Sequence, residues 1–128
     1  MQMLFANLLA LALLVQTGSA PGRVVNLVLP RGLTEGEGLA AELTLGVLER
    51  GAEIQVETMS GKLLGVISPH GIRSGHEAGT YTVPVPVEAI SNNRVSLRII
   101  RNRHPRGKRA PTPQELKSVK LTITPGNS

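Results

Sequence analysis

The stretch that decides the fold is residues 52–68, which read AEIQVETMSGKLLGVIS. Its first half alternates small or apolar residues with polar ones: Ala52, Ile54, Val56 and Thr58 against Glu53, Gln55 and Glu57. A period of two predicts a β-strand, because successive side chains point to opposite faces of a sheet. Gly61, which follows Met59 and Ser60, is free to take a positive φ and turn the chain. We therefore expect a hairpin whose first strand is covered on one face and wet on the other.

The returning strand of this hairpin, residues 62–68, is apolar on both faces. By the same alternation, Leu64 and Val66 are expected on one face, and Leu63 and Ile67 on the other. The composition supports sheet here and elsewhere, since β-branched and aliphatic residues fit a pleated, half-buried surface.

Similar short runs recur along the chain, with turn residues between them. We expect further strands at 24–29, 41–47, 81–85, 94–99 and 118–123. In the second of these runs the apolar positions are Ala41, Leu43, Leu45 and Val47. The expected loops are 30–38, 69–79, 91–93 and 101–116. About seven short strands without helical periodicity predict an all-β fold, an antiparallel two-sheet sandwich. A jelly roll and another Greek-key arrangement remain alternatives.

Pro84 lies within the run 81–85 and Pro86 directly after it, and proline cannot donate a backbone hydrogen bond. Pro84 and Pro86 have the same parity, so their nitrogens point to one side of the strand and leave the other side able to pair. We therefore expect an edge strand that is protected against further pairing.

Residues 1–20 predict a secretory signal peptide. Residues 4–15 are apolar except for Asn7, and residues 16–20, which follow, are rich in small residues. An apolar run of roughly 7–15 residues before small residues is typical of such a signal, whereas a membrane-spanning helix needs about 20. We expect cleavage after Ser19 or Ala20, which leaves 21–128 as a single β-sandwich domain in the periplasm or outside the cell. A retained, short, membrane-associated helix is the alternative.

The composition excludes several kinds of chemistry. Hydrophobic residues make up 41% of the chain, but it has no Trp, no Cys and no Asp, and its one Phe is Phe5. Without Cys there are no disulfides and no thiolate nucleophiles, and without Asp there are no Asp-rich calcium loops. No nucleophile elbow is recognisable either. We therefore expect a non-catalytic protein that needs no cofactor.

One short segment carries a family resemblance. Residues 77–83, Glu-Ala-Gly-Thr-Tyr-Thr-Val, resemble the acidic-x-Gly-x-Tyr-x-(Cys or Val) segment of immunoglobulin-like domains. The Cys and Trp of true immunoglobulin domains are absent. The resemblance implies that the hydroxyl of Tyr81 bonds back to nearby backbone as a structural corner. It also implies an adhesion or binding module. The alternative is an ordinary, partly buried strand tyrosine.

A basic stretch is the strongest polar feature of the chain. It consists of Arg101, Arg103, Arg106, Lys108 and Arg109. The chain has 14 Lys and Arg against 9 Asp and Glu; five of the 14 stand here, so the remainder balances the acidic residues. On an exposed loop, these cations predict binding of a polyanion such as an anionic glycan, a lipid headgroup or a phosphate chain. Nucleic acid is the least favoured, because no aromatics accompany the cations. A merely solvated loop and a proteolytic processing site are the alternatives.

Histidines suggest a different class of function. His70 and His76 lie in one expected loop, and His104 lies in another, so the three imidazoles predict a metal site if the loops share an end of the sandwich. The function we expect is an exported binding module for an unknown protein, an anionic glycan or another envelope component. An accessory metal-binding protein and a structural domain that assembles by strand addition at an uncapped edge are the alternatives.

Overall fold

The computed structural model of the chain describes residues 20–69 and 76–125. The expected signal peptide, except for Ala20, and His70 lie outside these residues. The elements in chain order are β1 (Arg23–Val28), β2 (Gly38–Val47), β3 (Glu53–Thr58), β4 (Leu63–Ile67), β5 (Glu77–Val85), the 3-10 turn η1 (Val87–Ala89), β6 (Arg94–Arg103), β7 (Gly107–Arg109) and β8 (Leu116–Thr124).

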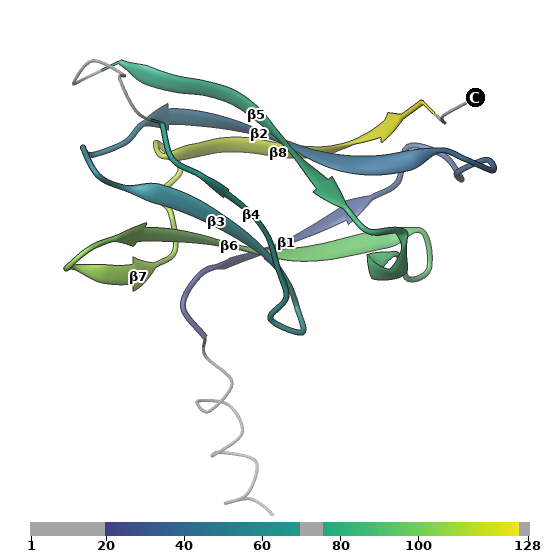
Figure 1. The fold of residues 1–128 in the computed structure, drawn as a ribbon, viewed down its shortest axis with the longest axis horizontal. Coiled ribbons are helices and arrows are strands. Elements are labelled where there is room, and N and C mark those ends of the chain that lie inside the picture. Colours follow the sequence, from purple (N-terminus) through teal and green to yellow (C-terminus); the bar gives the residue numbers. More distant parts are fainter. Residues whose placement is uncertain (1–19, 70–75, 126–128) are drawn as a thin grey trace, which may run out of the picture.

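The strands form two stacked antiparallel sheets (Figure 1). One sheet has the order β5-β2-β8, and the other has the order β1-β6-β3-β4 with the short β7 added to the end of β6. Aliphatic side chains fill the space between them, among them the fully buried Leu43, Ile54, Val56, Leu97 and Ile99. The predicted all-β, two-sheet sandwich is therefore confirmed. The hairpin that predicts it is present as β3 and β4, and Gly61 in its turn has φ +94°.

The predicted facing of the side chains in the returning strand, β4, is partly wrong. Ile67 is buried opposite Ile54, but Leu63 is 51% exposed and does not share its environment. The cause is a register shift: Val56 pairs with Gly65, whereas the next residue, Glu57, pairs with Leu63. A bulge inserts one extra residue into β4 and changes which side chains reach the core.

The expected burial of Val47 is wrong, because this residue lies beyond the last residue of β2 that pairs with β8. Between Thr44 and Leu45 the pairing of β2 with β8 shifts, and Val47 lies exposed at the end of the strand. Gly46 is buried instead, and its N–H donates to the carbonyl of Glu115 at 2.9 Å. A Cβ on Gly46 would overlap the carbonyl oxygen of Gln114. Glycine at this position therefore allows the chain before β8 to approach β2 closely.

The strand that contains Tyr81 is an outer strand, as predicted. β5 pairs only with β2, and Pro84 lies opposite Ala40. It begins at Glu77, so the expectation that residues 77–79 belong to a loop is wrong. The Tyr81 hydroxyl donates to the carbonyl of Ala78 at 2.7 Å, which is the local bond expected of a tyrosine corner.

The expected loop over 101–116 is the largest error of the sequence analysis. β6 continues to Arg103, and a short turn then leads into β7, so the basic stretch forms a β-hairpin. The alternation rule fails here because the inward position next to Ile54 is filled by Arg101, a charged residue that gives no apolar signal.

Candidate functional site

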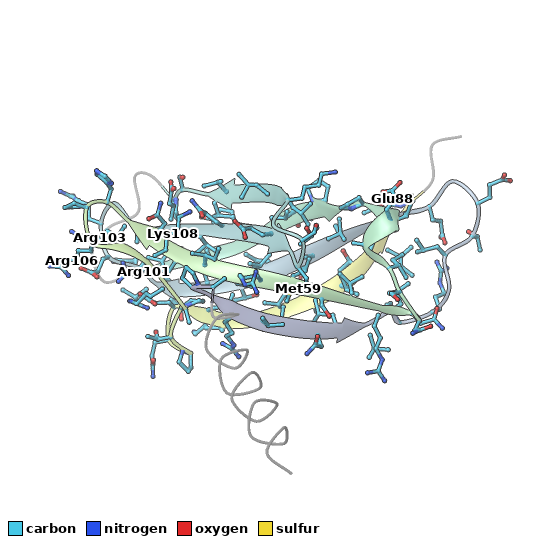
Figure 2. The ribbon with its side chains drawn as sticks, turned by 90° about the horizontal axis from the view of Figure 1, so that it is seen from below. Met59, Glu88, Arg101, Arg103, Arg106 and Lys108 are labelled. Carbon is cyan, nitrogen blue, oxygen red and sulfur yellow. The ribbon has the colours of Figure 1, made fainter. Side chains whose placement is uncertain are left out.

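The structure brings the five predicted basic residues together at one end of the sandwich. Figure 2 shows Arg101, Arg103, Arg106 and Lys108 at this end, with Glu88 at the opposite end. We call the five basic residues together with Glu49 and Glu115 the basic end. Its side chains come from three elements: the β6–β7 hairpin, the β2–β3 connection and the turn before β8.

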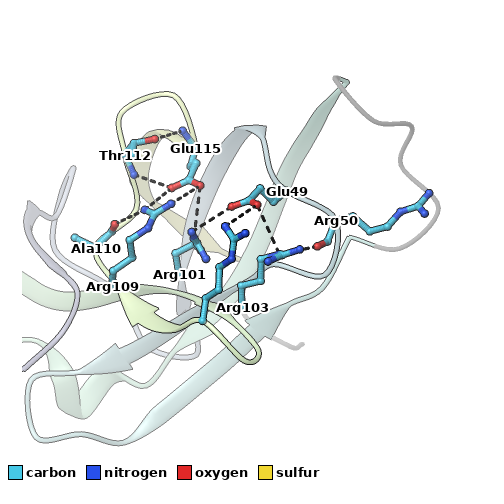
Figure 3. Close-up of polar contacts among 9 residues, drawn as sticks. Glu49, Arg50, Arg101, Arg103, Arg109, Ala110, Thr112 and Glu115 are labelled. Atoms are coloured by element: carbon cyan, nitrogen blue, oxygen red, sulfur yellow. Dashed lines mark hydrogen bonds and ion pairs between the residues drawn. The ribbon is translucent and has the colours of Figure 1, made fainter.

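Glu49 lies within ion-pair distance of three of the arginines (Figure 3). Its carboxylate lies 3.4 Å from Nη2 of Arg101, 3.8 Å from Nε of Arg103 and 3.5 Å from Nη1 of Arg106. Arg103 also donates from Nε to the carbonyl of Arg50 at 3.0 Å. One carboxylate thus holds the hairpin against the β2–β3 connection.

Glu115 forms ion pairs with Arg109 and, together with Glu49, with Arg101. Arg109 donates to both carboxylate oxygens at 2.8 and 3.0 Å, and Nε of Arg101 lies 3.6 Å from Oε2. The backbone N–H of Thr112 also donates to this carboxylate at 2.9 Å. Burial works to raise the pKa of Glu115, but these bonds and the charges of Arg109 and Arg101 outweigh it and hold the pKa below its usual value. The hydrogen bonds with Glu115 raise the pKa of Arg109.

Burial separates the five basic residues into two groups. Arg101 is only 4% exposed, so its charge needs the two carboxylates. Arg109 is half-buried against Glu115, and Arg103 is half-buried near Glu49. The Arg106 side chain is 65% exposed, and Lys108 is exposed and makes no ion pair within the described part of the chain. The expectation of five exposed cations on a loop is therefore wrong, and the polyanion prediction now rests mainly on Arg106 and Lys108.

The predicted histidine site is not assembled in the part of the chain that the structure describes. His76 and His104 are both exposed, and residues 20–69 and 76–125 contain no group of three His, Cys, Asp or Glu side chains placed to hold a metal ion. The three-histidine site includes His70, which lies outside these ranges, so that site stays a prediction.

A groove toward the opposite end of the sandwich was not predicted from the sequence. It has a volume of about 1050 Å³ and lies between the β3–β4 turn and the connection from β5 to β6. Figure 2 shows Met59 and Glu88, which belong to its two sides. We call it the end groove; its lining residues are Thr58, Met59, Ser60, Lys62, Pro86, Glu88, Ala89, Ser91, Asn92, Arg94 and Ser96.

Short hydrogen-bonded turns position the end groove. On one side, the hydroxyls of Thr58 and Ser60 lie 2.8 Å apart, and the Lys62 N–H donates to Oγ1 of Thr58 at 3.1 Å. On the other side, Ser91 and Arg94 exchange backbone hydrogen bonds of 2.9 and 3.0 Å around a two-residue turn. That turn, Asn92-Asn93, has φ of 55° and 61°, values that asparagine tolerates better than most residues.

The charges of the end groove differ from those of the basic end. Lys62, Glu88 and Arg94 make no ion pair within the described residues, and all three are exposed. Hydroxyl and amide groups from the two turns surround them, and Met59 adds an exposed apolar side chain. The end groove therefore offers donors, acceptors and two cations to a ligand.

A smaller hollow of about 290 Å³ lies between β4 and β5. Leu64, Gly65 and Val66 of β4 line one side, and Tyr81, Val83 and Pro84 of β5 line the other. The sheets approach closely here, since a Cβ on Gly65 would lie 3.0 Å from Cγ1 of Val83. We call this hollow the seam.

Comparison with known proteins gives no assignment: neither a family model, nor a curated protein, nor a solved structure matches this chain. Within residues 20–69 and 76–125, no helix has the length and hydrophobicity needed to cross a membrane.

Proposed function

We propose that this protein is an exported, non-catalytic binding module that holds its ligand in the end groove. The observation that carries the proposal is a groove of about 1050 Å³ in which Lys62, Glu88 and Arg94 have no ion-pair partner among the described residues. Binding residues commonly lie on loops that a rigid scaffold positions. The proposal of export rests on the apolar segment within residues 1–20 of the sequence, which is typical of a secretory signal.

The side chains of the end groove suit recognition. The hydroxyls of Thr58 and Ser60 bond to each other, and that of Thr58 also accepts from the Lys62 N–H, which fixes their orientation before a ligand arrives. Such preorganised donors and acceptors reduce the entropy cost of binding. The volume of the groove is at the upper end of the range for small-molecule pockets, about 300–1,000 Å³, so it also suits a segment of a larger partner.

Affinity capture from the envelope fraction of the source cells tests this proposal. The wild-type protein is compared with the double variant Lys62→Glu/Arg94→Glu and with Arg106→Glu/Lys108→Glu, a matched control that reverses two exposed charges at the basic end. We expect the groove variant alone to lose the captured component, at unchanged far-UV circular dichroism. Equal capture by all three proteins would contradict the proposal.

Polyanion binding at the basic end is a second candidate. The specific observation in its favour is that the side chain of Arg106 stays 65% exposed although it pairs with Glu49, and that Lys108 is exposed without an ion pair in the described part of the chain. An exposed pair of cations attracts anions through long-range electrostatics, which salt screens.

A further inference from the structure

We propose that the ligand of the end groove is an extended peptide segment that adds as a strand to the free edge of β4 and places an acidic group beside Lys62 and Arg94. This inference rests on the proposed function and names the class of ligand for the same site. Its basis is the juxtaposition of a strand edge without charge or proline, an apolar seam and a cationic groove along one side of the sandwich.

β4 is an outer strand that carries neither a charged residue nor a proline. It pairs with β3 on one side only, so its other side presents backbone N–H and C=O groups without a strand partner. Its sequence, LLGVI, has no charged residue and no proline, and Leu63 and Val66 are 51% and 43% exposed. Proteins normally protect such edges with charges or proline, because a bare edge pairs with other chains.

The other outer strands of the described sheets carry that protection. Arg23 lies in β1, Pro84 in β5, Lys117 and Lys120 in β8, and Lys108 and Arg109 in β7. The seam is therefore asymmetric: a peptide that enters it finds backbone partners on β4, whereas the proline of β5 removes one donor on the opposite side.

The seam and the end groove lie one after the other along the same two strands. Lys62 lines the groove and Leu64 lines the seam, while Pro86 lines the groove and Pro84 lines the seam. A peptide paired with β4 therefore extends directly from the seam into the groove. Main-chain hydrogen bonds to the edge provide affinity in this mode of recognition, and pockets for alternate side chains provide specificity.

Charge selects the kind of peptide. In the groove, Lys62 and Arg94 outnumber the single acidic residue, Glu88, and all three lack ion-pair partners in the described part of the chain. In the seam, Leu64, Val83 and Pro84 offer apolar contacts. The complementary segment has β-branched or apolar residues along β4 and a carboxylate at the groove end.

The test uses synthetic peptides of about six residues, a usual strand length. The probes alternate Thr and Val and end in two Glu or, in the matched control, two Lys; a third peptide carries Pro at alternate positions and cannot form a ladder. Binding to the isotope-labelled protein, in its full exported form, is followed by NMR titration and amide hydrogen exchange. We expect exchange protection at residues 63–67, roughly tenfold tighter binding of the Glu peptide than the Lys peptide, and no binding of the Pro peptide. The Lys62→Glu/Arg94→Glu variant should lose the preference for Glu.

Three results would overturn this inference. They are an absence of protection at β4 with every peptide, equal binding of the Glu and Lys peptides, and concentration-dependent protection of β4 without peptide, which would identify a second copy of the chain as the occupant. If the peptides fail while capture from the envelope still requires Lys62 and Arg94, the strand-addition inference falls and the proposed binding function stands.

Discussion

The two ends of the sandwich use their charges differently. At the basic end, Glu49 and Glu115 sit among the arginines and bring the β6–β7 hairpin against neighbouring segments (Figure 3). In the end groove, Lys62 and Arg94 have no carboxylate partner within the described residues. A dense run of cations in the sequence is therefore a weak indication of a binding site, because the fold can neutralise it internally.

Burial explains this difference. A buried charge without a partner is strongly unfavourable, so Arg101, at 4% exposed, requires acidic neighbours from wherever the fold supplies them. Glu49 comes from 52 positions away in the sequence. Exposed charges such as Lys62 have water as a partner and little need of an ion pair. They remain available to a ligand.

The largest effect is expected when Glu115 is removed from the basic end. The change Glu115→Ala leaves the buried Arg101 without one of its two carboxylates and should lower the free energy of unfolding by about 3–5 kcal/mol. The control Lys62→Ala should change it by less than about 0.5 kcal/mol. Urea denaturation measures both. Equal effects of the two changes would break the distinction between a structural end and a binding end.

A smaller effect is expected from acid. The pKa of Glu115 is lowered in the folded protein. The contribution of this carboxylate to stability is therefore complete at a pH above its usual pKa of 4.5, and it is lost as the pH falls through the lowered pKa. Arg31 and the Thr34 N–H similarly hold the pKa of Glu37 at about 2, so acid weakens that contact too. We expect the thermal midpoint to fall between about pH 5 and pH 2 and to fall less steeply in Glu115→Gln. Parallel curves for the two proteins would show that Glu115 has no such role.

The smallest effect on stability concerns the exposed cations of the basic end. Replacing Arg106 and Lys108 by Ser should change the free energy of unfolding by less than about 1 kcal/mol, since exposed ion pairs contribute little. The same variant should elute from a heparin column at lower salt than the wild type if this end binds polyanions. Retention equal to that of the wild type would end the polyanion prediction and leave this end as a structural device.

Much of the fold is predictable from the sequence because most strands alternate apolar and polar residues. β3 and β6 show this rhythm, and Ile54, Leu97 and Ile99 are buried as expected. The errors have local physical causes. A bulge in β4 reverses the facing of Leu63, and no residue type in the sequence marks a bulge. Val47 is exposed because it lies at the end of β2, beyond the last residue that pairs with β8.

The candidate sites were harder to predict. The β6–β7 hairpin was hidden because Arg101 occupies an inward position and its partners are remote in the sequence. The end groove is lined by ordinary turn residues from segments far apart in the chain, such as Ser60 and Ser91. The sequence predicts the turn at Asn92-Asn93, but only the antiparallel pairing of β6 with β3, in which Thr58 lies opposite Leu97, brings it near the β3–β4 turn.

Site-specific photocrosslinking in the cells that make the protein tests the division between the two ends most directly. A photoreactive amino acid replaces Met59, which is exposed in the end groove, or Lys108, which is exposed at the basic end. The proposed function predicts a crosslinked partner from position 59 and none from position 108. A partner captured only from position 108 would contradict it.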